Sequence, residues 1–423
     1  MTRRRLALVG AVLLVAACVE RLTAPGRCPD YCPSGQITIV DTLLTTSINR
    51  DSSYRGYVLA YEAALMLGAH VPRTTDTLDS RPIFRINGYG SRLRISTADT
   101  STGLIRSADS ARLQLYIVRR DTATRNLQLQ LYRLPIKIDT TTTFDSVESA
   151  FNDSLVKTVN IDMLLAQPGR KDPVTGDSVV VDTVNQRLVL SLKLDTAAAR
   201  YVGMDSGTVA YGIRIAADTL ASIAFGKGAF GPVLQWYLQV DSVVAQVARK
   251  PGALGAAFAS FVFAPPPAPL DSTLAVGGVP SARSLLRVTF PKVIRDSSQI
   301  IRATLFLVPA VPARGAPADS FVIEARTVLA DFGGKSPIDA RLGDTTVIHV
   351  GATDTVKTDT VKIEVTNLLQ LWAADSTHPT AILLRAQAEA QFLSEIRFYP
   401  SIAPAVRPTL RVTFVRAFPF GEP

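Results

Sequence analysis

The sequence predicts an all-β fold built from antiparallel β-sandwiches. From about residue 37 onward, short segments of alternating apolar and polar residues recur along the chain. Alternation with period two places every second side chain on one face of a sheet, as half-buried strands require. Clusters of Asp-Thr, Asp-Ser, Gly and Pro lie between these segments and favour turns. A similar order of segments occurs twice, which indicates two related units in tandem.

Strands are expected where the alternation is strictest, and helices are expected to be few. The clearest strand segments are Arg92–Ser96, Ala111–Val118, Leu127–Tyr132 and Arg187–Leu194. Two short helices are expected, at Ser146–Phe151 and at Asn367–Trp372. With 423 residues, of which 47% are hydrophobic, the chain has enough apolar material for two or three buried cores.

The first residues have the order of a secretory signal that ends at a cysteine. Arg3, Arg4 and Arg5 precede the apolar run Leu6–Ala17, and Cys18 follows. Small residues directly before a cysteine resemble the bacterial lipobox, in which that cysteine receives a diacylglycerol. Residues 1–17 are therefore predicted to be a lipoprotein signal peptide, and residues 18–36 a lipid-anchored tether.

Two alternatives to the lipoprotein interpretation remain open. A membrane-spanning helix needs about 20 apolar residues, and this run is shorter. The other alternative is a secreted protein that is cut near the same position. Stable attachment takes at least two acyl chains, which a triacylated Cys18 provides. Val19 occupies the position where Asp would signal retention in the inner membrane, so the predicted location is the outer membrane of the cell envelope.

The predicted tether contains the two other cysteines of the chain. Cys28 and Cys32 lie in the segment Cys28–Pro33, so they can bond only to each other or to another molecule. In an oxidising envelope compartment we expect a disulfide that closes a small loop. No histidine lies nearby in the sequence, so no metal site is predicted here.

The charge of the chain does not indicate nucleic acid binding. The formal net charge is +9, and three of these charges lie in the predicted signal peptide. The remaining charges of both signs are spread along the chain without a run of five basic residues. The predicted partners are the membrane, through the lipid anchor, and a polysaccharide or an envelope protein.

The repeated order of strand segments sets the expected domain boundaries. The segments Arg187–Leu194 and Val209–Ile215 in the first half correspond to Val361–Thr366 and Thr380–Ala386 in the second. We therefore expect one sandwich at residues 37–240 and another at residues 241–418. Each has the ordinary size of a single domain.

Several segments of the second unit resemble one known family. They are Arg283–Val288, Ile300–Leu307, Val365–Thr366 followed by Trp372, and Arg407–Val412. Their order resembles that of the DNRLRE-type domain, a jelly-roll sandwich related to carbohydrate-binding modules. The resemblance covers most of residues 241–415.

The first unit departs from the family pattern. Gly231–Leu234 replaces the closing Arg-Pro strand, Tyr201 stands where a Trp is expected, and a long insert separates Tyr132 from Arg187. The resemblance implies two jelly-roll-like sandwiches. It also implies polysaccharide binding or a structural role in surface proteins, and no catalysis.

No catalytic or metal-binding motif is found. His70, His349 and His378 are far apart and form no zinc-binding pattern, and no Gly-x-Ser-x-Gly elbow or P-loop occurs. The segments Gly226–Gly228 and Gly333–Lys335 are expected to be turns. Loop aspartates could hold Ca²⁺, but no Asp-x-Asp-x-Asp-Gly loop supports calcium, so no cofactor is predicted.

The carboxylates leave one enzymatic alternative open. A glycosidase needs two acids about 5–9 Å apart, and the chain has 36 Asp and Glu residues. Most aspartates directly precede Thr or Ser, where the side chain can bond a nearby backbone N–H and start a turn. They include Asp139, Asp145, Asp182, Asp218, Asp344 and Asp354.

Aromatic side chains are the remaining candidates for ligand binding. Trp236 and Trp372 lie in framework segments and are expected in the core. Tyr54, Tyr57 and Tyr61 are the candidate ligand-binding residues. On a strand, loop and strand they would present rings at a rim, whereas on one helical face they would pack in the core.

These observations lead to one functional hypothesis and two alternatives. The hypothesis is a non-catalytic, lipid-anchored envelope protein that displays a binding or scaffolding surface for polysaccharide. The first alternative is a surface polysaccharide hydrolase that uses loop carboxylates. The second is a structural subunit of an envelope assembly.

Overall fold

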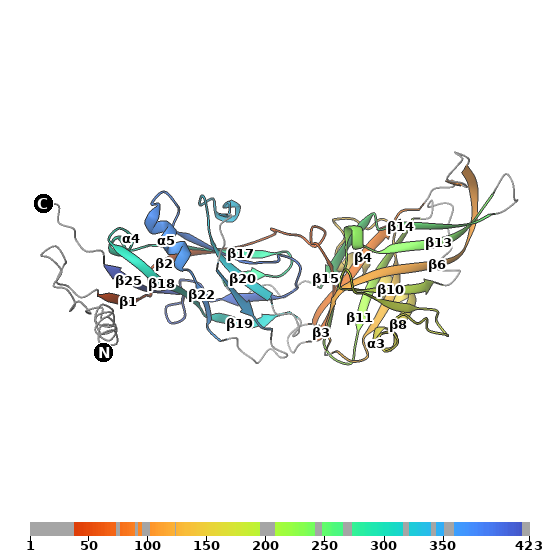
Figure 1. The fold of residues 1–423 in the computed structure, drawn as a ribbon, viewed down its shortest axis with the longest axis horizontal. Helices are drawn as coiled ribbons and strands as arrows, with labels where there is room; N and C mark the ends of the chain where they lie inside the picture. Colours follow the sequence, from red (N-terminus) through yellow and green to blue (C-terminus); the bar gives the residue numbers. More distant parts are fainter. Residues whose placement is uncertain are drawn as a thin grey trace, which may run out of the picture.

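The structure is a computed structural model of an elongated, mostly β-stranded molecule (Figure 1). Its strand pairs are antiparallel throughout the part of the chain described here. The predicted all-β, antiparallel fold is therefore confirmed. The described residues are 38–72, 77–88, 92–94, 102–122, 124–194, 208–241, 248–264, 273–315, 321–339, 344–350 and 359–416.

Two sheets pack into what we call the terminal sandwich. One sheet has the order β1-β25-β18-β22, with bounds Ile39–Leu44, Thr409–Arg416, Ser298–Leu307 and Val361–Glu364. The other has the order β19-β24-β16-β17-β23-β20-β21, and β2 also pairs with β17. The bounds in that order, with β2 last, are Pro309–Arg314, Glu395–Phe398, Leu274–Gly277, Ala282–Val288, Ala381–Ala386, Phe321–Thr327, Asp344–Ile348 and Ile48–Arg55.

The core of the terminal sandwich lies between its two sheets. Leu305 and Val412 of the first sheet join Leu286 and Ile323 of the second in one buried cluster. Trp372 is 0% exposed in this cluster, which confirms its predicted core role. Burial of such large apolar side chains is the main stabilising contribution to a sandwich.

The other strands form a single curled sheet, which we call the inserted sheet. Its main order is β14-β13-β6-β12-β3-β4-β11-β7-β8. In addition β5 and β10 pair with β6, β9 pairs with β10, and β15 pairs with β4. The bounds of β3 to β15 are Met66–Pro72, Thr77–Ile86, Arg92–Arg94, Thr102–Arg120, Gln128–Leu134, Leu155–Asn160, Ser178–Asp182, Arg187–Leu194, Val209–Ala216, Ala221–Phe225, Val233–Val240, Ala248–Gly255 and Phe258–Phe263.

The concave side of the inserted sheet encloses a second apolar core. Phe84, Tyr211 and Phe225 are buried there, and Trp236 is 2% exposed, as its predicted core role requires. Strand β6 is 19 residues long and pairs with β5, β10, β12 and β13 along its length. The length of this one strand lets it join several parts of the curled sheet.

Helices are short, and two of them contain the segments predicted to be helical. The bounds of α2, α3, α4 and α5 are Phe144–Asp153, Ile161–Leu165, Lys292–Arg295 and Thr366–Ala374. The 3-10 turns η2 and η3 span Gly228–Phe230 and Gly333–Lys335. Turn η3 coincides with one of the two glycine segments expected to be turns, and η2 begins at the last residue of the other.

Helix α2 packs on the convex face of the inserted sheet. Its sequence determines both where the helix begins and which of its side chains contact the sheet. The Thr143 hydroxyl accepts from the Ser146 amide, and the Ser146 hydroxyl accepts from the Thr143 amide. Such a capping box satisfies amide groups that have no partner in the helix. The Phe151 ring fills the space above Gly212, where an added Cβ would lie 2.3 Å from the ring.

Strand pairing crosses the expected boundary at residue 240 in both directions. Strands β1 and β2, from the expected first unit, pair with β25 and β17 of the second. Strands β14 and β15, from the expected second unit, pair with β13 and β4 of the first. Alternation identifies a strand but not its partner, so these long-range pairs were not visible in the sequence.

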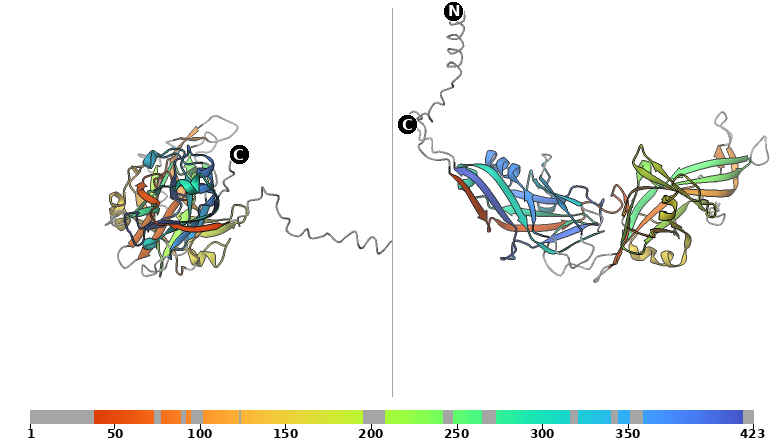
Figure 2. Two further views of the ribbon diagram at one scale, coloured as in Figure 1. Left: turned by 90° about the vertical axis from the view of Figure 1, so that its left-hand side faces the viewer. Right: turned by 60° about the horizontal axis from the view of Figure 1, so that its bottom comes forward.

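The terminal sandwich and the inserted sheet lie end to end and meet at an apolar junction (Figures 1 and 2). Arg119 of β6 donates to the carbonyl of Gln391 at 2.9 Å, and its guanidinium lies 4.0 Å from the Phe392 ring centroid. The shared cluster contains Ala63, Leu67, Ala224, Phe261, Val279 and Ala390. Both bodies therefore contribute to one buried contact.

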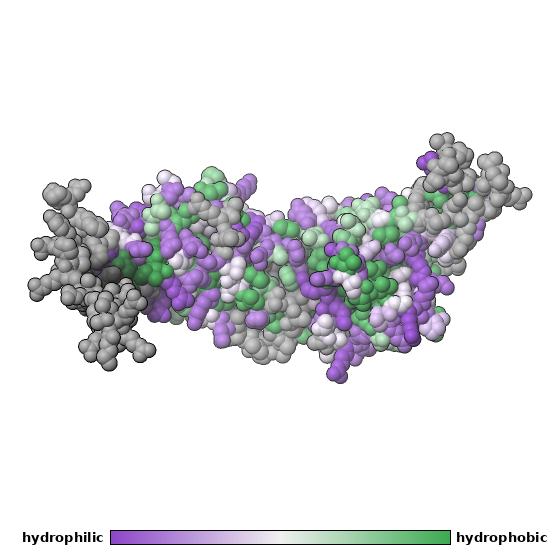
Figure 3. Space-filling view, in the orientation of Figure 1, coloured by the Kyte–Doolittle hydropathy of each residue, from purple (hydrophilic) through white to green (hydrophobic). Residues whose placement is uncertain are grey.

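The surface is mostly polar, with some exposed apolar side chains (Figure 3). On the inserted sheet these include Leu155 of β8, Met163 of α3, and Val180 and Val181 of β9. Within the described ranges, no helix has the length and apolar character needed to cross a membrane.

Candidate functional site

The predicted site residues fall into three different environments. Cys18, Cys28 and Cys32 lie outside the described residues, so lipidation and the disulfide stay predictions. Tyr54 and Tyr57 contact the η3 turn, whereas Tyr61 lines a cavity. The structure therefore does not bring the three tyrosines together at one rim.

Tyr54 and Tyr57 take part in packing within the terminal sandwich. A Cβ added to Gly334 would lie 3.0 Å from the Tyr54 ring, which shows how closely the turn approaches it. The Tyr57 hydroxyl donates to the Gly334 carbonyl, and the Arg283 guanidinium lies 3.9 Å from the Tyr57 ring centroid. Burial raises the pKa of Tyr57. Neither Tyr54 nor Tyr57 is among the residues that line the cavity at Tyr61.

Tyr61 lines a cavity of about 420 Å³ between the inserted sheet and the terminal sandwich. This volume is in the range of small-molecule sites. We call it the junction cavity. Its lining residues come from the segment after β2, the loop before α2, strand β15 and the turn before β17, namely Leu59–Tyr61, Asp139, Thr140, Thr142–Asp145, Ser260–Phe263, Val279 and Pro280.

Strand β15 supplies the apolar wall of the junction cavity. Its pairing with β4 holds Phe261 opposite Pro82 and Val262 opposite Arg81. Phe261 is 2% exposed, and its ring lies 6.2 Å from that of Phe263, centroid to centroid. Phe261 is therefore packed in the junction core, and the partly exposed Phe263 is the ring of this pair that can offer a flat apolar surface to a ligand.

The loop before α2 supplies the polar rim. Asp139 Oδ1 accepts from the Thr141 amide at 2.8 Å and from the Thr141 hydroxyl at 2.7 Å. The Asp139 amide donates to the Thr142 hydroxyl at 2.8 Å. This confirms the turn-forming role predicted for Asp139, and the hydrogen bonds from Thr141 hold its pKa below the ordinary range.

A buried ion pair lies behind the rim and supports Phe144. Arg81 is 3% exposed, and its guanidinium lies 4.2 Å from the Phe144 ring centroid and 4.8 Å from that of Phe151. Its Nη2 contacts Asp79 Oδ2 at 2.5 Å. The cation attracts the faces of both rings, so it holds the N-terminal end of α2 against the sheet.

Lys227 fixes the backbone beside Tyr61. Its Nζ donates to the carbonyl of Ala63 at 3.1 Å and also to the carbonyl of Tyr61. Burial lowers the pKa of Lys227. The segment that carries Tyr61 is therefore held against the inserted sheet by a side chain that does not line the cavity.

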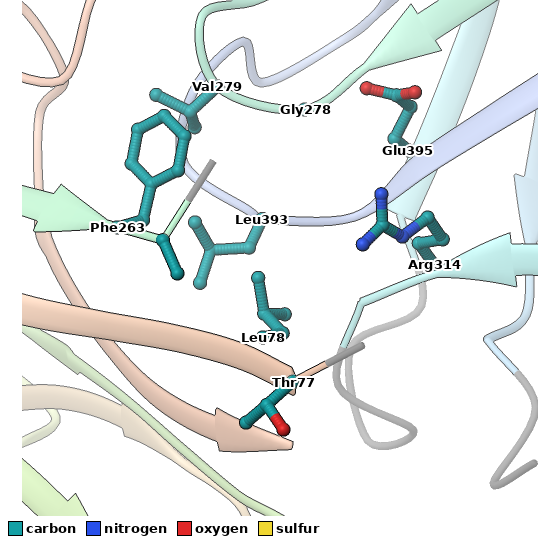
Figure 4. Close-up of a pocket in the computed structure, with 9 residues that line it drawn as sticks. Thr77, Leu78, Phe263, Gly278, Val279, Arg314, Leu393 and Glu395 are labelled. Atoms are coloured by element: carbon teal, nitrogen blue, oxygen red, sulfur yellow. The ribbon is translucent and has the colours of Figure 1, made fainter. Parts of the chain in front are cut away.

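Two other hollows are less suited to a ligand. One, at the junction, measures about 30 Å³ and lies between Leu78, Phe263 and Leu393 on one side and Arg314 and Glu395 on the other (Figure 4). This volume is far smaller than that of a sugar-sized ligand.

The other hollow is a groove of about 470 Å³ on the terminal sandwich. It contains no aromatic side chain, and its two arginines, Arg55 and Arg397, already bond to Glu395. The junction cavity is therefore the candidate functional site.

The junction cavity offers a ligand hydrogen-bonding groups, apolar contacts and two carboxylates. Asp139 and Asp145 both line it, together with the hydroxyl groups of Thr140, Thr142 and Ser260. No group of three or more His, Cys, Asp or Glu side chains that could hold a metal occurs among the described residues. The arrangement can bind a polyhydroxylated ligand against aromatic rings.

Sequence reasoning identified Tyr61 but missed most of the site. Phe144 and Phe263 were not proposed as ligand contacts, and Asp145 was expected only in a turn. The available signal was the long insert between Tyr132 and Arg187, which contains the run Thr140–Thr143. An insert rich in hydroxyl side chains is where a site on a loop is expected.

Comparison with known proteins adds no relative. No protein-family model matches the chain, and no curated protein matches it. The resemblance of residues 241–415 to the DNRLRE-type domain stays a prediction.

Proposed function

We propose that this chain is a non-catalytic, lipid-anchored protein of the bacterial cell envelope that binds saccharide in the junction cavity. The observation that carries the proposal is the pairing of two partly exposed aromatic side chains, Tyr61 and Phe263, with a hydroxyl-rich rim at Thr140, Thr142 and Thr143. Sugars present C–H groups on their ring faces and hydroxyl groups at their edges, so such a cavity matches both.

Truncation of Tyr61 tests the binding half of the proposal. Tyr61→Ala removes an aromatic contact from the cavity, while its carbonyl still accepts from Lys227. We expect the Kd for the oligosaccharide that binds the wild type to rise about fivefold, as loss of one aromatic contact implies. Affinity electrophoresis against a panel of neutral and charged polysaccharides identifies the ligand, and titration calorimetry measures the change.

Tyr399→Ala is the matched control for this experiment. Tyr399 is a partly exposed tyrosine next to β24 in the terminal sandwich, and it does not line the junction cavity. Its variant is expected to bind as the wild type does. If no polysaccharide in the panel binds the wild-type protein, or if both tyrosine variants weaken binding equally, the proposal is contradicted.

Replacement of Cys18 tests the lipid anchor. Support for the anchor comes from the sequence alone: three arginines, the apolar run Leu6–Ala17, and Cys18. Cells that express the wild-type chain with labelled palmitate are expected to yield a labelled protein in the outer-membrane fraction. Cys18→Ser should abolish both the label and the membrane association, while a labelled Cys18→Ser protein would refute this half.

A polysaccharide hydrolase is the second candidate, because Asp139 and Asp145 line the same cavity. A glycosidase uses one carboxyl as a general acid, which requires a raised pKa. Hydrogen bonds from Thr141 instead lower the pKa of Asp139. Asp139 is therefore unsuited to the role of the general acid, and release of reducing ends from the bound polysaccharide would favour a hydrolase over binding alone.

A further inference from the structure

The charged side chains of the junction cavity are all acidic. Among its described lining residues, the formally charged ones are Asp139 and Asp145, and neither forms a salt bridge. Thr141 donates to Oδ1 of Asp139, and Thr142 also interacts with this carboxylate. Both Asp139 and Asp145 are exposed, so their carboxylates can still reach a ligand.

The cationic side chains near the cavity do not line it. Arg81 is paired with Asp79 and is covered by the rings of Phe144 and Phe151. The N-terminus of α2 carries a partial charge of about +0.5, and the Thr143 cap and Asp145 in the first turn already offset it. A ligand in the cavity therefore meets two carboxylates and no exposed lining cation.

We propose that the junction cavity selects saccharides that carry a protonated amino group over neutral and acidic saccharides. This inference rests on the proposed function, since it assumes that the cavity binds saccharide. An ammonium group donates charge-assisted hydrogen bonds to the carboxylates of Asp139 and Asp145, while the sugar ring packs on Phe263 and Tyr61, which are partly exposed. A uronic acid or a sulfated sugar meets the same carboxylates with a like charge and is repelled.

Titration calorimetry with three tetrasaccharides tests the selection. The probes are a glucosamine tetramer, its N-acetylated form and a galacturonate tetramer, all at low salt and at a pH where the glucosamine amines are protonated. We expect the glucosamine tetramer to bind about fivefold to tenfold more tightly than the N-acetylated form, because two exposed carboxylates each add a modest attraction. The galacturonate tetramer should bind weakest.

Two variants locate the selection, and each has a matched control. Asp139→Asn keeps a side chain that can form the same turn, and Asp145→Asn keeps a polar residue in the first turn of α2. Each is expected to reduce the glucosamine preference about threefold. Asp182→Asn changes a similar turn at the β9–β10 hairpin, and Glu148→Gln changes the same helix away from the cavity, so both should leave the preference unchanged.

The possible results separate this inference from the function on which it rests. Equal affinity for the glucosamine and N-acetylated tetramers, or tightest binding of the galacturonate, overturns the selection but leaves saccharide binding intact. A preference that survives in both asparagine variants also overturns it. If none of the three tetramers binds, and no polysaccharide binds in the panel described above, both proposals fail.

Discussion

The inserted sheet and the terminal sandwich bury their apolar cores in different ways. The inserted sheet encloses its core by curling one sheet, and its strands come from the continuous segment Met66–Phe263. The terminal sandwich encloses its core between two sheets, and its strands come from both sides of that segment. Ile39 pairs with Val415, so the sandwich is completed only when distant parts of the chain meet.

This difference in sequence separation has consequences for stability and folding. Closing a long loop costs conformational entropy before the new contacts stabilise the fold, and folds with distant contacts form more slowly. In the terminal sandwich, an ion pair with a buried carboxylate also helps to hold β2 in place. Arg55 of β2 donates two hydrogen bonds, at 2.7 and 2.8 Å, to Glu395 of β24. We therefore expect a mutation in one core to destabilise mainly the body that contains it, and a mutation at the junction to weaken the coupling between the two bodies.

The largest expected effect comes from removing a core tryptophan. Trp372→Ala leaves a cavity in the terminal sandwich, and Trp236→Ala leaves one in the inserted sheet. Each should lower the free energy of unfolding of its own body by about 3–5 kcal/mol. Hydrogen exchange followed by mass spectrometry, read peptide by peptide, measures the two bodies separately. Equal loss of protection in both bodies from either variant would contradict the idea of two separate cores.

A smaller effect is expected from Glu395, and it should depend on pH. Burial raises the pKa of Glu395, but hydrogen bonds and charge from Arg55 and Arg397 outweigh this, so its pKa lies below the usual value. Glu395→Gln leaves two arginines without their carboxylate. Because the Arg55 side chain is 34% exposed, we expect a loss of about 2 kcal/mol at pH 7, less than for a fully buried pair.

The pH dependence of this effect has a definite sign. A carboxyl whose pKa is lowered by folding stabilises the protein above its unfolded pKa, about 4.3, and this stabilisation is lost as the pH falls further. Urea unfolding of wild type and Glu395→Gln between pH 7 and pH 3 should therefore show two curves that converge in acid. Curves that stay parallel over this range would show that the ionised carboxylate contributes nothing.

The smallest of these effects is expected at the junction. Arg119→Ala removes the hydrogen bond to the Gln391 carbonyl and the contact with the Phe392 ring. We expect a loss of about 1–2 kcal/mol in coupling, seen in calorimetry as a wider separation between the unfolding of the two bodies. Arg120→Ala is the control, because Arg120 faces Asp162 within the inserted sheet. A matching shift in the control would rule out a junction-specific role.

The sequence was informative about local structure and less so about partners. The segment Arg187–Leu194 was predicted to be a strand from alternation and coincides with β10, and the helix expected at Asn367–Trp372 lies within α5. Period and turn chemistry determine such features over a few residues. The choice of β25 as the partner of β1 depends on packing across more than three hundred residues, which no local pattern encodes.

At the candidate site, too, the local structure could be predicted from the sequence, whereas the contacts between distant segments could not. The turn at Asp139 was predicted from its own neighbours, whereas the approach of Phe261 and Val279 to that turn depends on how β15 pairs and where the two bodies meet. Tyr54, Tyr57 and Tyr61 are close in sequence but have different surroundings, because Tyr54 lies in β2 and Tyr57 just after it, whereas Tyr61 lies farther along the segment that leads to β3. Spacing alone could not distinguish packing rings from a cavity-lining ring.

The pairing of β1 with β25 places the beginning and the end of the described chain beside each other, at the end of the terminal sandwich farthest from the inserted sheet (Figure 2). A tether joined to β1 would act from that end and would hold the junction cavity a full sandwich length from the point of attachment. The sandwich would then serve as a spacer. If the proposed lipid anchor and saccharide binding both hold, a polymer could reach the cavity without entering the layer of headgroups next to the bilayer.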